Sequence, residues 1–213
     1  MIRGVLLDLD GVIIDTLHYH YLAWQHMFAQ RGGNVREHTV LLHEGRASRE
    51  ILPILMEEAG VSIPEDKQAA FIEAKRAYFR TIVHVRQYPG AFEVIDTLKG
   101  RGYKIALVTA CAQKNMQHSL DRAQQEHFDF IITGDEVPRA KPFPDPYLTA
   151  AREIGVSPSD CVVVENAPLG IEAAKSAGMY CVAIETTLAR EYLQSADCIL
   201  TDIRYLLQLP ILQ

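Results

Sequence analysis

The sequence predicts an α/β fold in which a parallel sheet is covered by helices on both faces and carries an inserted all-helical segment. Three observations lead to this prediction: short runs that are apolar throughout, amphipathic stretches between them, and one long region with helical periodicity alone. Apolar strands that alternate with helices are typical of parallel sheets buried on both faces. Such Rossmann-like sheets bind ligands at the carboxyl ends of their strands.

The expected strands and helices alternate along most of the chain. We expect strands at residues 2–9, 103–108, 128–133, 161–165, 180–184 and 198–200, and helices at residues 91–99, 115–125, 146–154 and 170–177. Residues 16–86 show helical periodicity with no convincing strand, and the Y-P-G run at 88–90 marks the return to alternation. We therefore expect an α/β core of residues 1–15 and 88–213 and a helical cap of residues 16–87, placed over the end of the first strand.

Composition limits the classes of function. The chain has 213 residues, 48% of them hydrophobic and 23% charged, which suits one domain with an insert. The net charge of -6 and the absence of a Lys/Arg cluster argue against a nucleic-acid partner. No apolar run approaches the roughly 20 residues of a membrane span, and the N-terminus does not resemble a signal peptide. The four scattered cysteines fit a reducing compartment, so we expect a cytoplasmic protein, and nothing demands more than a monomer.

Two carboxylates end the first expected strand. Asp8 and Asp10 stand two residues apart, so their side chains point to the same side of an extended chain, and Gly11 permits a sharp turn after them. Two acids at the carboxyl end of a strand make a hard oxygen site that suits Mg²⁺. Taken alone, the D-L-D-G run could also be an acidic turn at the protein surface.

Other motifs follow in a fixed order along the chain. After D-L-D-G-V-I-I-D-T at residues 8–16 come V-T-A at 108–110, K-P-F-P-D at 141–145 and V-V-E-N-A-P-L-G-I-E-A-A-K at 163–175. Over nearly the whole chain these motifs resemble the haloacid dehalogenase-like hydrolase superfamily. The helical insert is similar to the superfamily's first type of cap, as in β-phosphoglucomutase-like and phosphoglycolate phosphatase-like members.

The resemblance implies a mechanism and assigns residues to it. Asp8 would attack phosphorus and form an aspartyl-phosphate, and Asp10 would protonate the leaving oxygen and then activate water. Thr109, Ala110 and Lys141 would bind the transferring phosphoryl group, and Mg²⁺ would reduce repulsion between Asp8 and the phosphate. Taken alone, Thr109 could cap a helix and Lys141 could be a solvated loop lysine. The prolines of K-P-F-P favour an aimed lysine, because they stiffen its loop.

The metal site implied by the resemblance departs from the family pattern. Relatives commonly carry two acids where this chain has Glu165 and Asn166. We expect Mg²⁺ to be held by Asp8, by the main-chain carbonyl of Asp10, by Glu165 directly or through water, and by the amide oxygen of Asn166. Because an amide brings no charge, the affinity should be weaker than that of an acid pair. Asn166 could also cap the helix that begins near Pro168.

Three residues of the helical insert are candidates for substrate binding. Arg49 resembles the cap arginine that grips a distal phosphate in β-phosphoglucomutase, and a guanidinium suits that task. His20 and Lys75 approximately match cap or hinge positions of the same enzyme. Each could instead be an ordinary helix residue. A zinc site at His18 and His20 is rejected, because residues two apart on a helix do not face each other.

The leading prediction is therefore a Mg²⁺-dependent phosphatase of small phosphorylated compounds, with sugar phosphates as the expected substrates. A phosphosugar mutase of the β-phosphoglucomutase kind is the nearest alternative, since it would use the same aspartyl-phosphate. Haloacid dehalogenase and phosphonatase activities are disfavoured, because neither needs the second acid, Asp10. A binding protein without catalysis is disfavoured because all four catalytic positions, Asp8, Asp10, Thr109 and Lys141, are filled.

Overall fold

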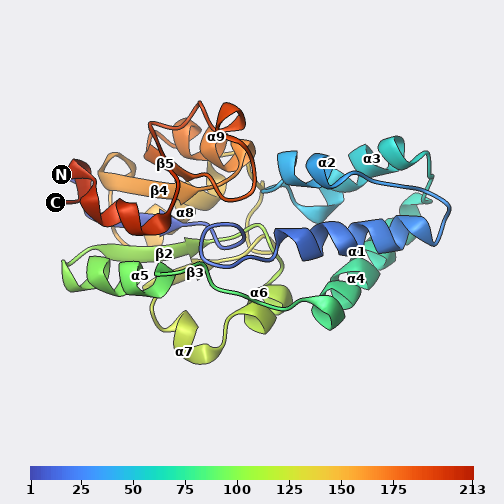
Figure 1. Cartoon of the computed structure of the whole chain (residues 1–213), viewed down its shortest axis with the longest axis horizontal. Coiled ribbons are helices and arrows are strands. Elements are labelled where there is room, and N and C mark those ends of the chain that lie inside the picture. Colours follow the sequence, from blue (N-terminus) through green and yellow to red (C-terminus); the bar gives the residue numbers. More distant parts are fainter.

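Six short strands form one parallel sheet in the order β3-β2-β1-β4-β5-β6 (Figure 1). The computed structural model describes all 213 residues. The strands are β1 (Gly4–Leu7), β2 (Lys104–Val108), β3 (Phe130–Ile132), β4 (Cys161–Glu165), β5 (Tyr180–Ile184) and β6 (Cys198–Leu200). This order is that of a Rossmann-like sheet, and it confirms the predicted fold class.

Nine α-helices accompany the sheet. They are α1 (Leu17–Ala29), α2 (Glu37–Leu42), α3 (Ser48–Ala59), α4 (Glu65–Ile82), α5 (Ala91–Gly100), α6 (Gln113–Ser119), α7 (Arg122–Gln125), α8 (Asp145–Glu153) and α9 (Pro168–Ser176). Short 3-10 helices lie at η1 (Pro158–Asp160), η2 (Arg190–Tyr192), η3 (Ile203–Gln208) and η4 (Pro210–Leu212). None of the helices combines the length and the apolar character needed to cross a membrane.

The two faces of the sheet carry separate hydrophobic cores, because successive side chains of a strand point to opposite faces. Val5 and Leu7 of β1 belong to the core that includes residues of α5, α6, η3 and η4. Leu6 belongs to the core that includes residues of α8 and α9. All three side chains are completely buried. Strand β1 is therefore apolar at every position, which is the pattern that predicted it.

One predicted helix, at residues 115–125, is in fact two. Helix α6 ends at Ser119, Leu120 adopts an extended conformation, and α7 begins after Asp121. The Asp121 carboxylate accepts a hydrogen bond from the N–H of Gln124, whose side chain accepts one in return from the N–H of Asp121. This capping box begins a new helix and explains the break.

Helices α1 to α4 pack around a hydrophobic core of their own, at one end of the sheet (Figure 1). Its centre includes the side chains of Phe28, Leu52 and Leu55, all completely buried. The chain enters this part after β1 and leaves it before α5. The two connections lie side by side, since the N–H of Asp15 donates to the carbonyl of Arg86 at 2.7 Å. Both termini lie at the opposite end of the sheet.

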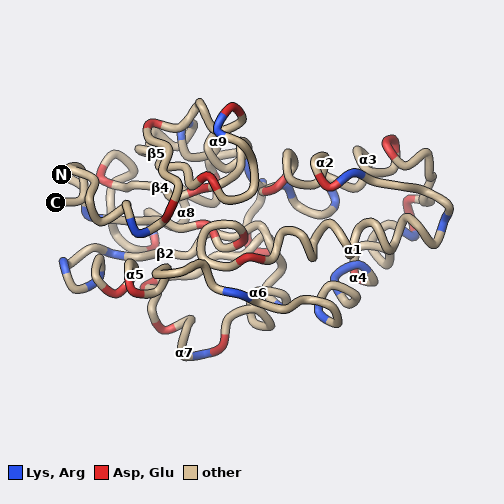
Figure 2. The backbone as a smooth tube through the Cα atoms, in the orientation of Figure 1, with Lys and Arg blue, Asp and Glu red and all other residues tan.

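Basic and acidic residues are interspersed along the chain in both parts of the molecule (Figure 2). No long basic segment is visible in the tube, in keeping with the net charge of -6.

Candidate active site

Three strands bring the predicted catalytic groups to one edge of the sheet. In the parallel register the last residue of β1, Leu7, pairs with Leu107 of β2 and Val164 of β4. Asp8 and Glu165 therefore become neighbours, and both are buried. The strand order reverses between β1 and β4, and Rossmann-like sheets bind their ligands at the carboxyl side of this point.

Lys141 joins the two acids at this edge. Its ammonium donates to Asp8 Oδ1 at 2.5 Å, to Glu165 Oε1 at 2.6 Å and to the main-chain carbonyl of Val108 at 3.2 Å. Burial alone would lower the pKa of Lys141, but Asp8 and Glu165 outweigh burial and raise it above its usual value. Burial raises the pKa of Asp8 well above its usual range, although Lys141 opposes this shift. Lys141 therefore stays protonated beside Asp8, whose charged form is destabilised by burial.

Glu165 is hydrogen-bonded at both carboxylate oxygens. Oε1 accepts from Lys141 and, at 2.7 Å, from the Tyr147 hydroxyl, and Oε2 accepts from the N–H groups of Asn166 at 2.9 Å and Ala167 at 3.2 Å. A carboxylate has about four lone-pair sites, and all are used here. In this arrangement Glu165 holds Lys141 in place, and its expected contact with a metal, direct or through water, stays a prediction.

Asp10 is linked to the helical part of the molecule by a chain of contacts. Its Oδ1 accepts a hydrogen bond from the Thr16 hydroxyl and lies 3.6 Å from Nε2 of His20. On the other side of the ring, the Lys75 ammonium lies 2.9 Å from Nδ1. Because an ammonium can only donate, Nδ1 is the acceptor and Nε2 carries the proton that faces Asp10.

The pKa values along this chain follow from burial and charge. Burial and the neighbouring Lys75 lower the pKa of His20, so its ring is neutral near pH 7. Burial would raise the pKa of Asp10, but hydrogen bonding to His20 and Thr16 holds it below its usual value. Burial lowers the pKa of Lys75 to about 8.

Asn166 has one buried side-chain oxygen that no hydrogen bond uses. Its amide nitrogen donates to the Thr187 hydroxyl at 2.9 Å, whereas its Oδ1 is the one buried side-chain polar atom without a hydrogen-bond partner. Buried polar atoms are rarely left unpaired, so Oδ1 is suited to a metal ion. The main-chain carbonyl of Asp10 accepts no backbone hydrogen bond either. With the Asp8 carboxylate these are three hard oxygen ligands, which fit Mg²⁺.

No three His, Cys, Asp or Glu side chains converge in a way that could hold a metal ion without such help. A cation at this edge would therefore also need the amide oxygen of Asn166 and the main-chain oxygen of Asp10.

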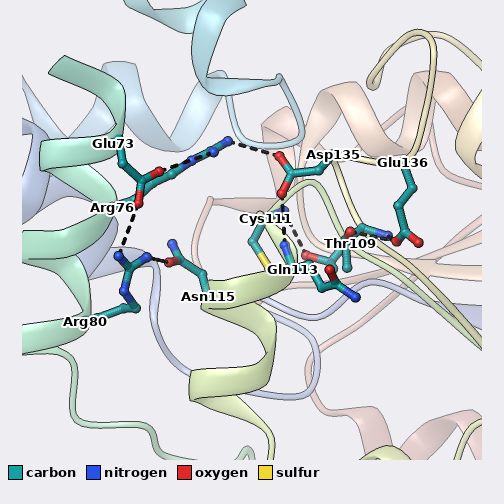
Figure 3. A network of polar contacts seen from close by, with 10 residues as sticks. Glu73, Arg76, Arg80, Thr109, Cys111, Gln113, Asn115, Asp135 and Glu136 are labelled. Carbon is teal, nitrogen blue, oxygen red and sulfur yellow. Dashed lines mark hydrogen bonds and ion pairs between the residues drawn. The ribbon is translucent and has the colours of Figure 1, made fainter. Parts of the chain in front are cut away.

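Thr109 and Ala110 lie at the end of β2. Thr109 is buried, and its Oγ1 accepts a hydrogen bond from the N–H of Cys111 at 3.1 Å (Figure 3). This contact leaves the hydroxyl hydrogen free to donate. Ala110 lines a cavity of about 50 Å³ between the sheet edge and the helical part.

Two of the three predicted cap residues line the cavity. His20 and Lys75 line it, but Arg49 does not. The Arg49 side chain is 62% exposed and pairs with its neighbour Glu50 at 3.7 Å, so the binding of a distal phosphate by Arg49 stays a prediction. Arg46, three residues earlier, lines the cavity instead. Both arginines belong to one motif, and only the turn before α3 decides which of them points inward.

A second polar network ties α4 to the core beside this cavity (Figure 3). Arg76 lies 3.3 Å from Asp135, and Arg80 donates to Asn115 Oδ1 at 2.7 Å. Glu73 pairs with both arginines, at 3.8 Å and 3.3 Å. Sequence reasoning did not find the contacts of Arg76 with Asp135 and of Arg80 with Asn115, because these partners lie 59 and 35 residues apart in the chain.

Comparison with known proteins agrees with this geometry. Residues 5–184 match the sequence profile of the family described as haloacid dehalogenase-like hydrolase. The chain belongs to this family. Because the match spans both the sheet and the helical segment, the motifs and the fold point to the same assignment.

Relatives within the family include two phosphatases and a mutase. Validoxylamine A 7'-phosphate phosphatase of Streptomyces hygroscopicus subsp. limoneus is 32% identical over 205 residues, covering 95% of each chain. A phosphorylated carbohydrates phosphatase of Thermotoga maritima is 33% identical, covering 83% of this chain and 82% of the relative. β-Phosphoglucomutase of Bacillus subtilis is 34% identical, covering 85% and 83%.

A solved structure shares the whole fold. The crystal structure of β-phosphoglucomutase from Clostridium difficile superposes with a TM-score of 0.84 at 26% identity, covering 98% of this chain and 96% of that chain. The sheet and the helical part are therefore arranged as in other members of the haloacid dehalogenase-like family.

Proposed function

We propose that this protein is a Mg²⁺-dependent phosphatase that hydrolyses small phosphorylated metabolites, with sugar phosphates as its substrates. The observation that carries the proposal is the buried cluster of Asp8, Lys141 and Glu165 with Asp10 beside it. The names of the relatives support the substrate class, since two of them act on phosphorylated carbohydrates or a related phosphate ester.

In the first step a carboxylate oxygen of Asp8 attacks phosphorus, and the bond from phosphorus to the leaving oxygen breaks. Asp10 delivers a proton to the leaving oxygen. The free side chain of Asp10 is ionised, but a phosphate next to it raises its pKa by like-charge repulsion, so the acid form arises on substrate binding. The product is an aspartyl-phosphate on Asp8 and a free alcohol.

In the second step water attacks the phosphorus of the aspartyl-phosphate. Asp10 accepts the proton of this water, and the Asp8 carboxylate is the leaving group. The Thr109 hydroxyl donates to a phosphoryl oxygen. All three protons of Lys141 are engaged in the free protein, so a phosphoryl oxygen would replace the longest contact, to Val108 at 3.2 Å.

Asp8, the Asp10 carbonyl and Asn166 Oδ1 would hold the metal. When bound, Mg²⁺ offsets the negative charge where carboxylate and phosphate meet.

Residues 16–87 would act as a cap that opens for substrate. The cavity of about 50 Å³ is far smaller than the roughly 300–1,000 Å³ of typical ligand sites. Entry of a sugar phosphate therefore requires the helical part to move away from the sheet edge. Closure would then exclude water from the reacting groups.

The test is release of inorganic phosphate from a panel of sugar and polyol phosphates, with and without Mg²⁺. Asp8→Asn should abolish release. Asp160→Asn is the matched control, because Asp160 precedes β4 at the opposite edge of the sheet. Release that persists in Asp8→Asn, or that is lost equally in Asp160→Asn, would refute the assignment of Asp8 as the nucleophile.

A mutase is the second candidate, favoured by the chain of contacts from Lys75 through His20 to Asp10 and by the similarity to β-phosphoglucomutase. It would return the phosphoryl group from Asp8 to another hydroxyl of the sugar. An isomerised sugar phosphate with little free phosphate, detected by NMR of the reaction mixture, would decide for it.

A further inference from the structure

Helix α4 docks on the sheet part of the molecule through charged side chains beside the cavity (Figure 3). Two contacts of this network cross between the helical part and the sheet part. Nη2 of Arg76 lies 3.3 Å from Oδ1 of Asp135, and Nη1 of Arg80 donates to Oδ1 of Asn115 at 2.7 Å. Asp135 lies in the loop after β3, and Asn115 lies on α6. The mechanism proposed above uses none of these four side chains.

Each half of this contact is held in place on its own side. Glu73, on the same helix as the two arginines, pairs with Arg76 at 3.8 Å and with Arg80 at 3.3 Å. On the other side, the N–H of Gln113, where α6 begins, donates to Oδ2 of Asp135 at 3.1 Å. Movement of α4 away from the sheet part would therefore break two contacts and leave both surfaces arranged to form them again.

The crossing ion pair is partly open to solvent. The side chains of Arg76 and Asp135 are 25% and 45% exposed. Ion pairs of this kind contribute little individually and are screened by salt. By comparison, the chain of contacts from Lys75 through His20 to Asp10 is largely buried and should be screened much less. The network on α4 is therefore the connection between the two parts that responds to ionic strength.

The loop of Gly134 and Asp135 is bonded to the segment that carries Thr109. The N–H of Gly134 donates to the carbonyl of Cys111 at 2.9 Å. A Cβ placed on Gly134 would lie only 2.1 Å from the carbonyl oxygen of Ala110, so only glycine permits this approach of the two backbones. The crossing contacts therefore hold α4 on the segment that would bind the phosphoryl group.

We propose that Arg76 and Arg80 are positioning residues that latch the helical part onto Asp135 and Asn115 in the closed arrangement, and that ionic strength sets the balance between open and closed molecules. The importance of this latch for catalysis rests on the proposed function, in which closure excludes water from the reacting groups. The latch itself needs no substrate, so it can be tested without one.

Cys111 is a built-in probe of opening. It lines the cavity of about 50 Å³, which is far below the roughly 300 Å³ of sites that admit small molecules. Iodoacetamide should therefore reach this thiol when the helical part has moved away. The rate of alkylation of Cys111, followed by mass spectrometry of its peptide, is then proportional to the ratio of open to closed molecules. Cys198, on β6 and outside the cavity, is the internal reference.

Arg76→Ala and Asp135→Asn should each speed the alkylation of Cys111 about 2- to 5-fold at about 0.1 M NaCl, the range expected for a partly exposed ion pair. The double variant Arg76→Ala/Arg80→Ala should exceed both. Raising NaCl to about 1 M shortens the screening length from about 10 Å to about 3 Å. Alkylation should therefore also speed up about 2- to 5-fold in the wild type and stay unchanged in the double variant.

Asp129→Asn is the matched control for Asp135→Asn. Asp129 likewise binds a cation, Lys104 at 3.4 Å, and a main-chain N–H, that of Ile105 at 2.8 Å, but at the opposite edge of the sheet. Its alkylation rate should equal that of the wild type. Thermal unfolding of each variant verifies that it is folded, and the salt series on the wild type tests the latch without any substitution.

The proposal is overturned if Arg76→Ala and Asp135→Asn react at the wild-type rate, or if salt leaves the wild-type rate unchanged. It is also overturned if Asp129→Asn or the reference thiol of Cys198 speeds up equally, because the whole fold would then be loosened. Absence of phosphate release from every compound would refute the proposed function and leave these alkylation rates as they are, so the two failures are distinguishable.

Discussion

Asn166 offers the sharpest test of the metal site. Asn166→Asp preserves the shape of the side chain and adds one negative charge at the atom that lacks a partner, Oδ1. Two unit charges 4 Å apart attract by about 4 kcal/mol at an effective dielectric constant of about 20. Desolvation of the new carboxylate and its repulsion by Asp8 oppose this gain. If the net gain in the free energy of Mg²⁺ binding is about 1.4–2.8 kcal/mol, the Mg²⁺ concentration for half-maximal activity should fall about 10- to 100-fold.

The same change should destabilise the protein when Mg²⁺ is absent. It places a further carboxylate beside Asp8, whose pKa burial already raises. A buried charge without a partner costs about 3–5 kcal/mol, which for a chain of this length lowers Tm by about 6–20 °C. Mg²⁺ binds the folded state and should restore this loss, with a larger rise in Tm in the variant than in the wild type.

The assays are a Mg²⁺ titration of phosphate release and thermal unfolding with and without Mg²⁺. Asn34→Asp is the matched control, because Asn34 is exposed and makes its hydrogen bond to Gln25 in the helical part. An unchanged or higher half-activating concentration in Asn166→Asp would refute the assignment of Oδ1 to the metal. So would a Tm response to Mg²⁺ no larger than that of the wild type.

Three further predictions follow from the buried ionisable groups. Tyr147→Phe removes one of four hydrogen bonds to Glu165, and it should lower the free energy of unfolding by about 1–3 kcal/mol in urea titrations while phosphate release persists. Lys141→Met leaves Asp8 and Glu165 buried without their shared cation, so phosphate release should be lost. The free energy of unfolding in urea titrations should fall by about 3–5 kcal/mol. Lys75 is 3% exposed and has a pKa of about 8 when folded against 10.5 ordinarily, so the unfolded chain holds more protons between these values. The free energy of unfolding should therefore rise by up to about 3 kcal/mol from pH 8 to pH 10.5, and urea titrations of Lys75→Met should lack this rise.

The parts of the fold that local pattern determines were predictable from the sequence. Strands buried on both faces must be apolar throughout, and β1, β2 and β4 were found for that reason. Their parallel pairing then requires the groups at their carboxyl ends to meet, so the approach of Asp8 to Glu165 follows from strand order. The boundary between α6 and α7 was missed, because the capping box at Asp121 interrupts an otherwise continuous helical pattern.

The parts of the site that depend on docking between the sheet and the helices were not predictable in the same way. Arg46 and Arg49 are the same residue type in one short motif, and which of them lines the cavity depends on the turn at Gly45 against Lys141. Glu165 reads as a metal ligand in the sequence, but Tyr147, on α8, reaches it from a different segment of the chain. The direction of these side chains depends on how distant segments pack together, so local sequence does not predict it.

The two neighbouring acids differ because different parts of the molecule surround them. Asp8 lies between strands of the sheet, and burial raises its pKa. The pKa of Asp10 is held down by Thr16, at the start of α1, by His20 within α1 and by Lys75 of α4. These shifts run opposite to those of a ready nucleophile and general acid, so a cation at Asp8 and a phosphate beside Asp10 would each have to reverse one of them. Since the three groups around Asp10 all come from the helical part, movement of that part away from the sheet would change the protonation equilibrium of Asp10 and leave that of Asp8 to the sheet and Lys141. The position of the helices would thereby be coupled to the proton transfer proposed for Asp10.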